Sequence, residues 1–136
     1  MSKKIWITIA IVICISVVAI VEIRTKKIYQ TDASKIQEII VKKTSDKVKV
    51  RVSKDDKLHV VYYKGISYNY DIEEKDGQLK IAGKYKFPIS FDFQSPTLII
   101  ELPAYYGNKL EINTEGNCSV DQTIKFSDIK INSDEK

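Results

Sequence analysis

Strict alternation of apolar and polar residues is the feature that most constrains the fold of this chain. Residues 47–52 read Lys-Val-Lys-Val-Arg-Val, which places three valines on one face of an extended strand and three cations on the other. Runs of the same kind, separated by corners rich in Gly, Asn, Asp and Ser, follow at 68–72, 97–102, 109–114 and 128–133. The dipeptide Asp76-Gly77 is a strong signal for a tight β-hairpin. Because no segment after position 45 has a helical period, the sequence predicts an all-β body. The run at 36–43 is compatible with a helical start, and a further strand is expected at 119–124.

Two of these runs look like one motif used twice. Lys-Leu-Glu-Ile-Asn-Thr at 109–114 and Asp-Ile-Lys-Ile-Asn-Ser at 128–133 are offset by 19 residues. A repeat of this length, with Gly, Asn and Asp at its corners, is typical of a β-solenoid in which each rung stacks on the next. The fold class that we predict is therefore a β-solenoid-like stack of short strands. Two copies are fewer than the roughly three rungs that a stable solenoid needs, and the strand spacing would also suit a β-sandwich.

The N-terminal segment differs in kind from the rest. Residues 5–21 are 17 consecutive residues without a charge. Because a backbone in lipid must satisfy its own hydrogen bonds, this run predicts one transmembrane helix near the lower length limit for crossing a bilayer. Lys3 and Lys4 precede the run, and Trp6 lies where an amphipathic ring favours the membrane interface.

We expect this segment to be an uncleaved signal anchor. A cleaved signal peptide is the alternative, but Ile20 and Val21 continue the apolar run past the weak cleavage pattern that ends at Ala19. A lipoprotein signal is disfavoured because Ile13, which is not a small residue, precedes Cys14. Cations flank both sides of the run almost equally, so charge alone does not orient the helix in the membrane.

These features predict three parts: a transmembrane anchor with a short basic N-tail at 1–23, a juxtamembrane linker at 24–35 and a β-rich domain at 36–136. The formal net charge of +4 comes from residues 1–30, where five cations outnumber one carboxylate, while the rest of the chain carries 17 charges of each sign. A body that is neutral overall argues against nucleic acid as a partner.

Charge within the body is nevertheless uneven. Residues 35–57 carry eight basic and four acidic side chains, whereas residues 87–136 carry four basic and eight acidic ones. This pattern indicates either two solvated faces or a charged binding face for an envelope polymer or a partner protein. On the second interpretation, the candidate binding surface consists of Lys47, Lys49, Arg51, Tyr105 and Tyr106. The two tyrosines follow Pro103 at a corner, where exposed rings would stack on a sugar or grip a protein.

The sequence offers no constellation for catalysis. His59 is the single histidine, which excludes a histidine relay and a His-cluster metal site. Cys14 and Cys118 lie about a hundred residues apart and have neither disulfide nor metal-ligand spacing. The acidic hairpin at 71–76 lacks the pattern of a calcium-binding loop. There is also no Gly-rich phosphate loop and no nucleophile motif, so we expect no enzyme activity, no cofactor and no metal.

Four stretches in order carry a family likeness. They are Ile-Ile-Val-Lys-Lys-Thr-Ser-Asp-Lys-Val-Lys-Val-Arg-Val, Tyr-Asn-Tyr-Asp-Ile-Glu-Glu-Lys-Asp-Gly, Leu-Ile-Ile-Glu-Leu-Pro103 and Lys-Leu-Glu-Ile-Asn-Thr-Glu-Gly116. From Ile36 to the end, the chain resembles the bacterial "putative adhesin" domain family, a domain of unknown function. The resemblance implies a β-solenoid-like fold, tethering by one N-terminal membrane helix and a source among Gram-positive bacteria.

The residues and the resemblance together lead to one expected function and one alternative. We expect a non-catalytic, membrane-anchored extracytoplasmic β domain with a binding, adhesion or envelope-sensing role. Its expected partners are the lipid bilayer, through residues 5–21, and a cell-wall polymer or membrane protein. The alternative is an assembly partner in a membrane complex that uses an open β edge. Members of the family usually continue through further rungs, and here charged residues at 134–136 either discourage strand pairing at that end or flank a docking site.

Overall fold

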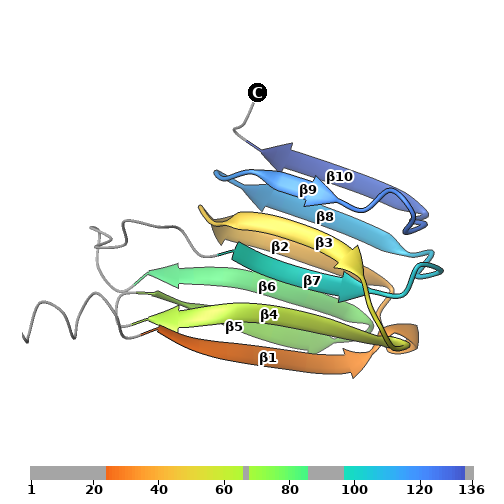
Figure 1. Ribbon diagram of the computed structural model, residues 1–136, viewed down its shortest axis with the longest axis horizontal. Helices are drawn as coiled ribbons and strands as arrows, with labels where there is room; N and C mark the ends of the chain where they lie inside the picture. Colours follow the sequence, from red (N-terminus) through yellow and green to blue (C-terminus); the bar gives the residue numbers. More distant parts are fainter. Residues whose placement is uncertain (1–23, 66–67, 86–96, 134–136) are drawn as a thin grey trace, which may run out of the picture.

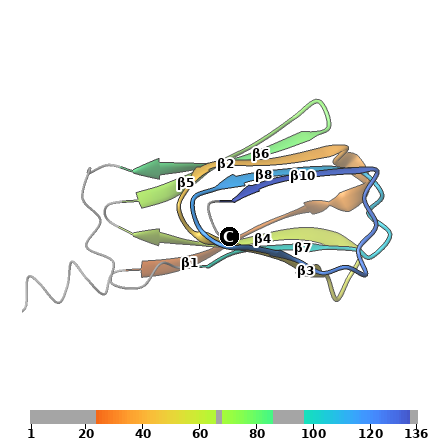
Figure 2. The same cartoon turned by 90° about the horizontal axis from the view of Figure 1, so that it is seen from above.

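Ten strands and one 3-10 turn make up the part of the chain that the computed structural model describes, namely residues 24–65, 68–85 and 97–133. Sheet A has the strand order β1-β4-β7-β3-β9, and sheet B has the order β10-β8-β2-β6-β5. The two sheets lie face to face as two layers (Figures 1 and 2). The bounds are β1 Arg24–Asp32, η1 Ala33–Lys35, β2 Glu38–Thr44, β3 Lys47–Val52, β4 Lys57–Gly65, β5 Tyr68–Lys75, β6 Gln78–Tyr85, β7 Thr97–Leu102, β8 Lys109–Thr114, β9 Cys118–Val120 and β10 Asp128–Ser133.

Parallel pairing stacks the strands into rungs. In sheet B, β2 lies between β6 and β8, and β10 pairs with the far side of β8. In sheet A, β3 lies between β7 and β9. The predicted 19-residue repeat is confirmed, because Ile129 and Ile131 of β10 pair in register with Leu110 and Ile112 of β8. The predicted β-solenoid-like stack is thus the observed arrangement.

The rungs do not follow one another in space as they do in sequence. The first complete rung, β2 and β3, occupies the middle of the stack, with β6 and β7 on one side and β8 and β9 on the other (Figure 1). At the lower end of the stack the strands pair antiparallel instead: β1 with β4, β4 with β7, and β5 with β6. The turn between β5 and β6 is the predicted hairpin, with positive φ at Asp76 (53°) and Gly77 (78°) as a type I′ turn requires.

The core lies between the two sheets. Strand alternation sends one residue in two inward, so that Val48 and Val50 of β3 are each 1% exposed while the cations between them face solvent. The same pattern buries Leu98, Ile100 and Leu102 of β7. Aliphatic side chains from both sheets fill the layer between them, among them Ile36, Ile39, Val41, Leu58, Leu79, Ile81, Leu110 and Ile112.

The corners after β2 and β8 stack directly on each other. Thr44 and Thr114 are partners across the sheet, and the Thr114 hydroxyl donates to the backbone oxygen of Asp46 at 2.7 Å. The buried carboxylate of Asp46 accepts a hydrogen bond from the Tyr70 hydroxyl, which also lies 2.5 Å from the Thr44 hydroxyl. A Cβ at Gly116 would lie 2.7 Å from the backbone oxygens of both Ser45 and Asp46. The corners therefore approach as closely as they do because this position has no side chain.

The two ends of the stack differ. At the lower end, the hydroxyls of Tyr29 and Thr31 on β1 both donate to the carboxylate of Glu74 on β5, which links the edge strands of the two sheets. At the upper end, the inward-facing Ile129 and Ile131 of β10 remain 44% and 40% exposed. One end of the core is thus covered by polar side chains, and the other end exposes apolar surface.

Three expectations from the sequence differ from the structure. Residues 24–35, expected as a linker, contain β1 and η1, because pairing with β4 along nine residues makes a strand of a segment without a clear pattern. The run that begins at Ile36, which could start as a helix, forms β2 from Glu38, since it pairs with strands on both sides. The expected strand at 119–124 is shorter and ends at Val120.

The predicted anchor at 1–23 and the charged residues at 134–136 lie outside the described residues. Within residues 24–65, 68–85 and 97–133, no helix has the length and apolar character needed to cross a membrane.

Candidate binding surface

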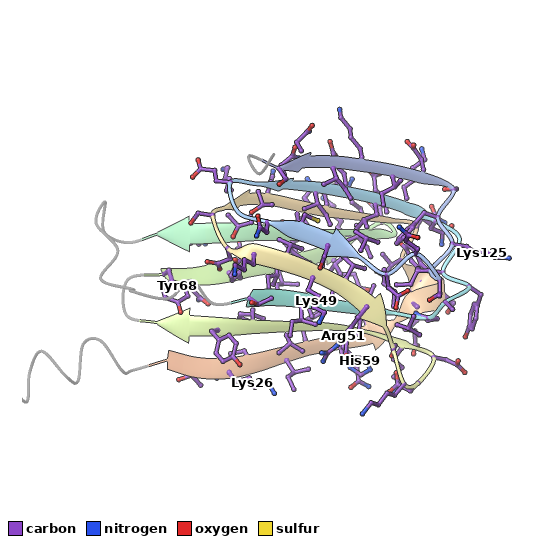
Figure 3. All side chains as sticks on the ribbon, turned by 45° about the horizontal axis from the view of Figure 1, so that its top comes forward. Lys26, Lys49, Arg51, His59, Tyr68 and Lys125 are labelled. Carbon is purple, nitrogen blue, oxygen red and sulfur yellow. The ribbon has the colours of Figure 1, made fainter. Side chains whose placement is uncertain are left out.

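The outer face of sheet A gathers cations. Because Val48 and Val50 point into the core, Lys47, Lys49 and Arg51 point outward from β3, as predicted. On β1, Tyr29 and Thr31 point inward to Glu74, so Lys26, Ile28 and Gln30 point outward. Lys57, which begins β4, lies on the same face because Leu58 is buried. Figure 3 shows Lys26, Lys49, Arg51 and His59 over the strands of this sheet.

The outer faces of the two sheets differ in charge. Among the described residues, sheet A presents five cations on its strands against the two carboxylates of Asp32 and Glu101. Sheet B presents six cations against five carboxylates, and two of its ion pairs are Lys84–Asp71 at 3.5 Å and Lys130–Glu111 at 3.9 Å. Opposite charges intersperse on sheet B, whereas sheet A carries a basic surface.

An aliphatic row crosses this basic surface. Strand register places Ile28, Val61 and Ile99 side by side on β1, β4 and β7, and Lys49 of β3 continues the row. Ile28 is 60% exposed, while Val61 is covered by its neighbours. The face therefore combines apolar contact area with charge, which is a common composition for a surface that binds another molecule.

One end of the basic surface is held by side-chain hydrogen bonds. Arg51 Nε donates to Glu101 at 2.7 Å, so this guanidinium is already paired and oriented. His59 Nε2 lies 2.8 Å from Asp55 Oδ1 in the turn before β4. The hydrogen bond from His59, together with those from the Lys57 amide and the Ser53 hydroxyl, lowers the pKa of Asp55 to about 2. Arg51 is thus already engaged by a carboxylate of its own sheet, which leaves the lysines of this face to meet an incoming anion.

The two predicted tyrosines have different surroundings. Tyr105 is 67% exposed, as expected, and its hydroxyl donates to Asp56 at 2.7 Å. Tyr106 is buried, contrary to the expectation that both rings are exposed. Its ring packs edge-on against that of Phe126, with the two ring centroids 6.0 Å apart. Burial raises the pKa of the Tyr106 phenol well above its usual range. Of the two rings, only Tyr105 is therefore exposed to solvent over most of its surface.

Sequence reasoning missed Lys26 and Ile28, because both lie in the segment taken as a linker. The alternation around Ile28 is weak, and no local signal shows that β1 pairs with β4 thirty residues later. His59 is a partly buried residue of β4. Cys118 lies on β9, where burial raises the pKa of its thiol. Within the described residues there is no group of three or more His, Cys, Asp or Glu side chains placed to hold a metal ion.

This geometry defines the class of protein: a two-layered stack of β rungs whose outer faces are candidate binding surfaces. Comparison with known proteins makes the class specific. Residues 36–135 match the profile of the family described as Toastrack DUF4097, so the chain belongs to that family. The resemblance to an adhesin-like domain of unknown function is thereby confirmed.

A solved structure supports the fold. The chain is similar to a putative cell adhesion protein from Clostridium sporogenes, with a TM-score of 0.58 and 10% sequence identity. The similarity covers 81% of this chain and 57% of that chain, so this chain spans little more than half of the longer protein. A comparison with curated proteins finds no match.

Proposed function

We propose that this chain is a non-catalytic, membrane-anchored extracytoplasmic β domain that binds an anionic polymer of the cell envelope. The observation that carries the proposal is the basic outer face of sheet A, where five cations outnumber two carboxylates. An adhesion-like role agrees with the protein from Clostridium sporogenes described above. The apolar run at 5–21 supports tethering to the lipid bilayer as one transmembrane helix.

The test compares charge on the two sheets. The full chain, held in nanodiscs of uncharged lipid, is titrated with poly(glycerol phosphate) as an anionic probe. In the sheet A variant, Lys47, Lys49 and Arg51 are replaced by Gln; in the control, the sheet B residues Lys42, Lys80 and Lys84 are replaced by Gln. Each variant loses three cations, one of which is ion-paired in the structure.

The sheet A variant is expected to bind roughly tenfold to a hundredfold more weakly, because a Lys or Arg near an anionic surface contributes about 1 kcal/mol or somewhat less. The control should bind as the wild type does, and wild-type binding should weaken as salt rises. Equal affinity of the two variants would refute the basic face as the binding surface. Protection of the domain from protease in intact cells, with cleavage only after lysis, would place it in the cytoplasm and exclude the envelope role.

A second candidate function is assembly through the upper end of the stack. Two inward-facing isoleucines of β10 are exposed there, and a hollow of about 810 Å³ next to Ile131 and Ser133 reaches the stacked corners. Strand addition to an open β edge supplies backbone hydrogen bonds along with cover for the apolar side chains.

Sedimentation of the full chain in detergent micelles tests this candidate. If copies pair at β10, the wild type is an oligomer that dissociates on the double change Ile129→Lys and Ile131→Lys. The control change Ile28→Lys, at a residue that is 60% exposed on sheet A, should leave the oligomer intact. A wild type that stays monomeric at high concentration would refute pairing between copies.

A further inference from the structure

A separate hollow lies where β1 ends, at the opposite end of that strand from residue 24. Its volume is about 480 Å³, which is within the range of small-ligand sites. Three corners of the chain meet around it: η1 after β1, the turn before β4, and the corner between β7 and β8. None of the predicted cations Lys47, Lys49 and Arg51 lines this hollow. Both predicted tyrosines, Tyr105 and Tyr106, do line it.

Tyr105 provides an aromatic wall that is held in place. Its hydroxyl donates to Asp56 at 2.7 Å, which fixes the tip of the ring. Its backbone corner is also fixed, since the Tyr106 amide bonds to Pro103 O at 3.0 Å and the Gly107 amide to Lys125 O at 2.8 Å. A ring that is 67% exposed and already oriented loses little conformational entropy when a ligand covers it.

The floor of the hollow is apolar and rigid. Ala33 and Tyr106 line it, and they are 6% and 7% exposed. Tyr106 packs against Phe126, and the side chain of Asn108 donates to the backbone oxygen of Ile36 at 3.0 Å, which holds the adjoining wall. Pre-formed walls of this kind are typical of sites that bind small polar molecules.

The polar groups around the rim select against anions. Among the lining residues, Asp32 and Asp56 supply carboxylates against the cation of Lys57, and the Ser34 hydroxyl adds another polar group. Lys35, outside the lining, lies 3.6 Å from one oxygen of Asp32, which leaves the other oxygen to accept from a ligand. Carboxylate oxygens accept hydrogen bonds, so the complementary ligand is rich in hydroxyl donors. A ligand with donors along one edge and an apolar face for the tyrosine ring has the chemistry of a pyranose sugar.

We propose that this hollow binds a pyranose unit of an uncharged glycan, with the C–H face of the sugar on the Tyr105 ring and its hydroxyls donating to Asp32 and Asp56. The site deepens the envelope-binding role proposed above and rests on it for its biological setting. The two surfaces share Lys57 and Asp32, but Lys47, Lys49 and Arg51 of the basic face do not line this hollow, and its carboxylates and tyrosine suit neutral sugars rather than anions.

Calorimetric titration of the full chain in detergent micelles tests the site, with chitotetraose and maltotetraose as probes. One of the two is expected to bind saturably at one site per chain. Tyr105→Ala should weaken that binding about tenfold, because the ring contact is lost. Tyr105→Phe keeps the ring but loses the bond to Asp56, so its affinity should lie between those of the wild type and the Ala variant.

Two control variants distinguish the hollow from the rest of the protein surface. Tyr63→Ala changes a partly exposed tyrosine of β4 outside the hollow and should leave sugar binding unchanged. The variant with Gln at 47, 49 and 51 should also keep sugar binding, while Tyr105→Ala should keep binding to poly(glycerol phosphate). If neither oligosaccharide binds, or if Tyr105→Ala binds as the wild type does with an unchanged melting temperature, the sugar site is refuted and the basic-face proposal is unaffected.

Discussion

Gly116 is a residue at which a single added methyl group would disturb the stacking of rungs. In Gly116→Ala, the new Cβ would lie 2.7 Å from the backbone oxygens of Ser45 and Asp46. Both oxygens belong to the corner between β2 and β3, and Asp46 is buried and hydrogen-bonded to Tyr70 and Thr114. Since neither contact is the mobile end of a side chain, the backbone itself must move by several tenths of an ångström.

Gly116→Ala is expected to lower the free energy of unfolding by about 1–3 kcal/mol, the usual range when an extra carbon is forced into a close-packed site. For a domain of about a hundred residues, 1 kcal/mol corresponds to a fall in melting temperature of roughly 4–8 °C. Thermal unfolding of the full chain in detergent, followed by circular dichroism, measures this change. Glu115→Ala, at the exposed neighbouring residue, is the matched control and should change stability by less than about 0.5 kcal/mol. A Gly116→Ala variant as stable as that control would refute the close approach of the two corners.

Three further predictions concern the carboxylates and the core. Asp55→Asn should destabilise the protein at neutral pH, and the difference from the wild type should shrink as pH falls from about 4 to about 2. The sign follows because the pKa of Asp55 is lowered from 3.8 to about 2 on folding, so the ionised carboxylate stabilises the folded state and this stabilisation is lost as the carboxylate is protonated. Melting temperatures of the wild type and the variant, measured at each pH, give the difference; a difference that stays constant between about pH 4 and about pH 2 would contradict the prediction. Tyr70→Phe should cost about 1–3 kcal/mol in chemical denaturation, because the buried Asp46 carboxylate loses a donor; an unchanged midpoint would argue against that bond. Ile112→Ala should lower the free energy of unfolding by about 2–5 kcal/mol, because Ile112 is fully buried in the stack. Ile131→Ala should lower it much less, because Ile131 is 40% exposed, and equal losses would mean that β10 is covered.

Four of the alternating strands were predictable to the residue, whereas β5 continues three residues past the run at 68–72. The bounds of β3, β7, β8 and β10 agree with the runs at 47–52, 97–102, 109–114 and 128–133, because alternation is written in each segment itself. The hairpin at Asp76-Gly77 was predictable for the same reason. The motif Thr114-x-Gly116 was part of the resemblance to the family. The structure explains both residues: the Thr114 hydroxyl bonds to the neighbouring corner, and Gly116 lets the two corners approach closely.

Features that depend on distant partners were not predictable. β1 exists because β4 pairs with it, and nothing local in residues 24–32 carries that information. The insertion of β7 between β4 and β3 is likewise a property of the whole sheet. At the candidate site, the sequence identified the cations of β3 and the corner tyrosines. It did not distinguish Tyr105 from Tyr106, because burial of the second ring depends on Phe126, twenty residues further on.

The central position of β2 and β3 has a consequence for how the protein acquires its structure during synthesis. Both strands leave the ribosome early, but the neighbours on their two sides, β6, β7, β8 and β9, are all made later. In a regular repeat array each unit contacts only its neighbours in sequence, so a newly made unit can dock on the one made just before it. Here the earliest unit has bare backbone edges on both sides until most of the chain has emerged, so loop closure over long separations must come first and folding should be slow. We therefore expect newly made chains to expose β edges for longer than those of a regular array, which favours binding by chaperones before folding is complete.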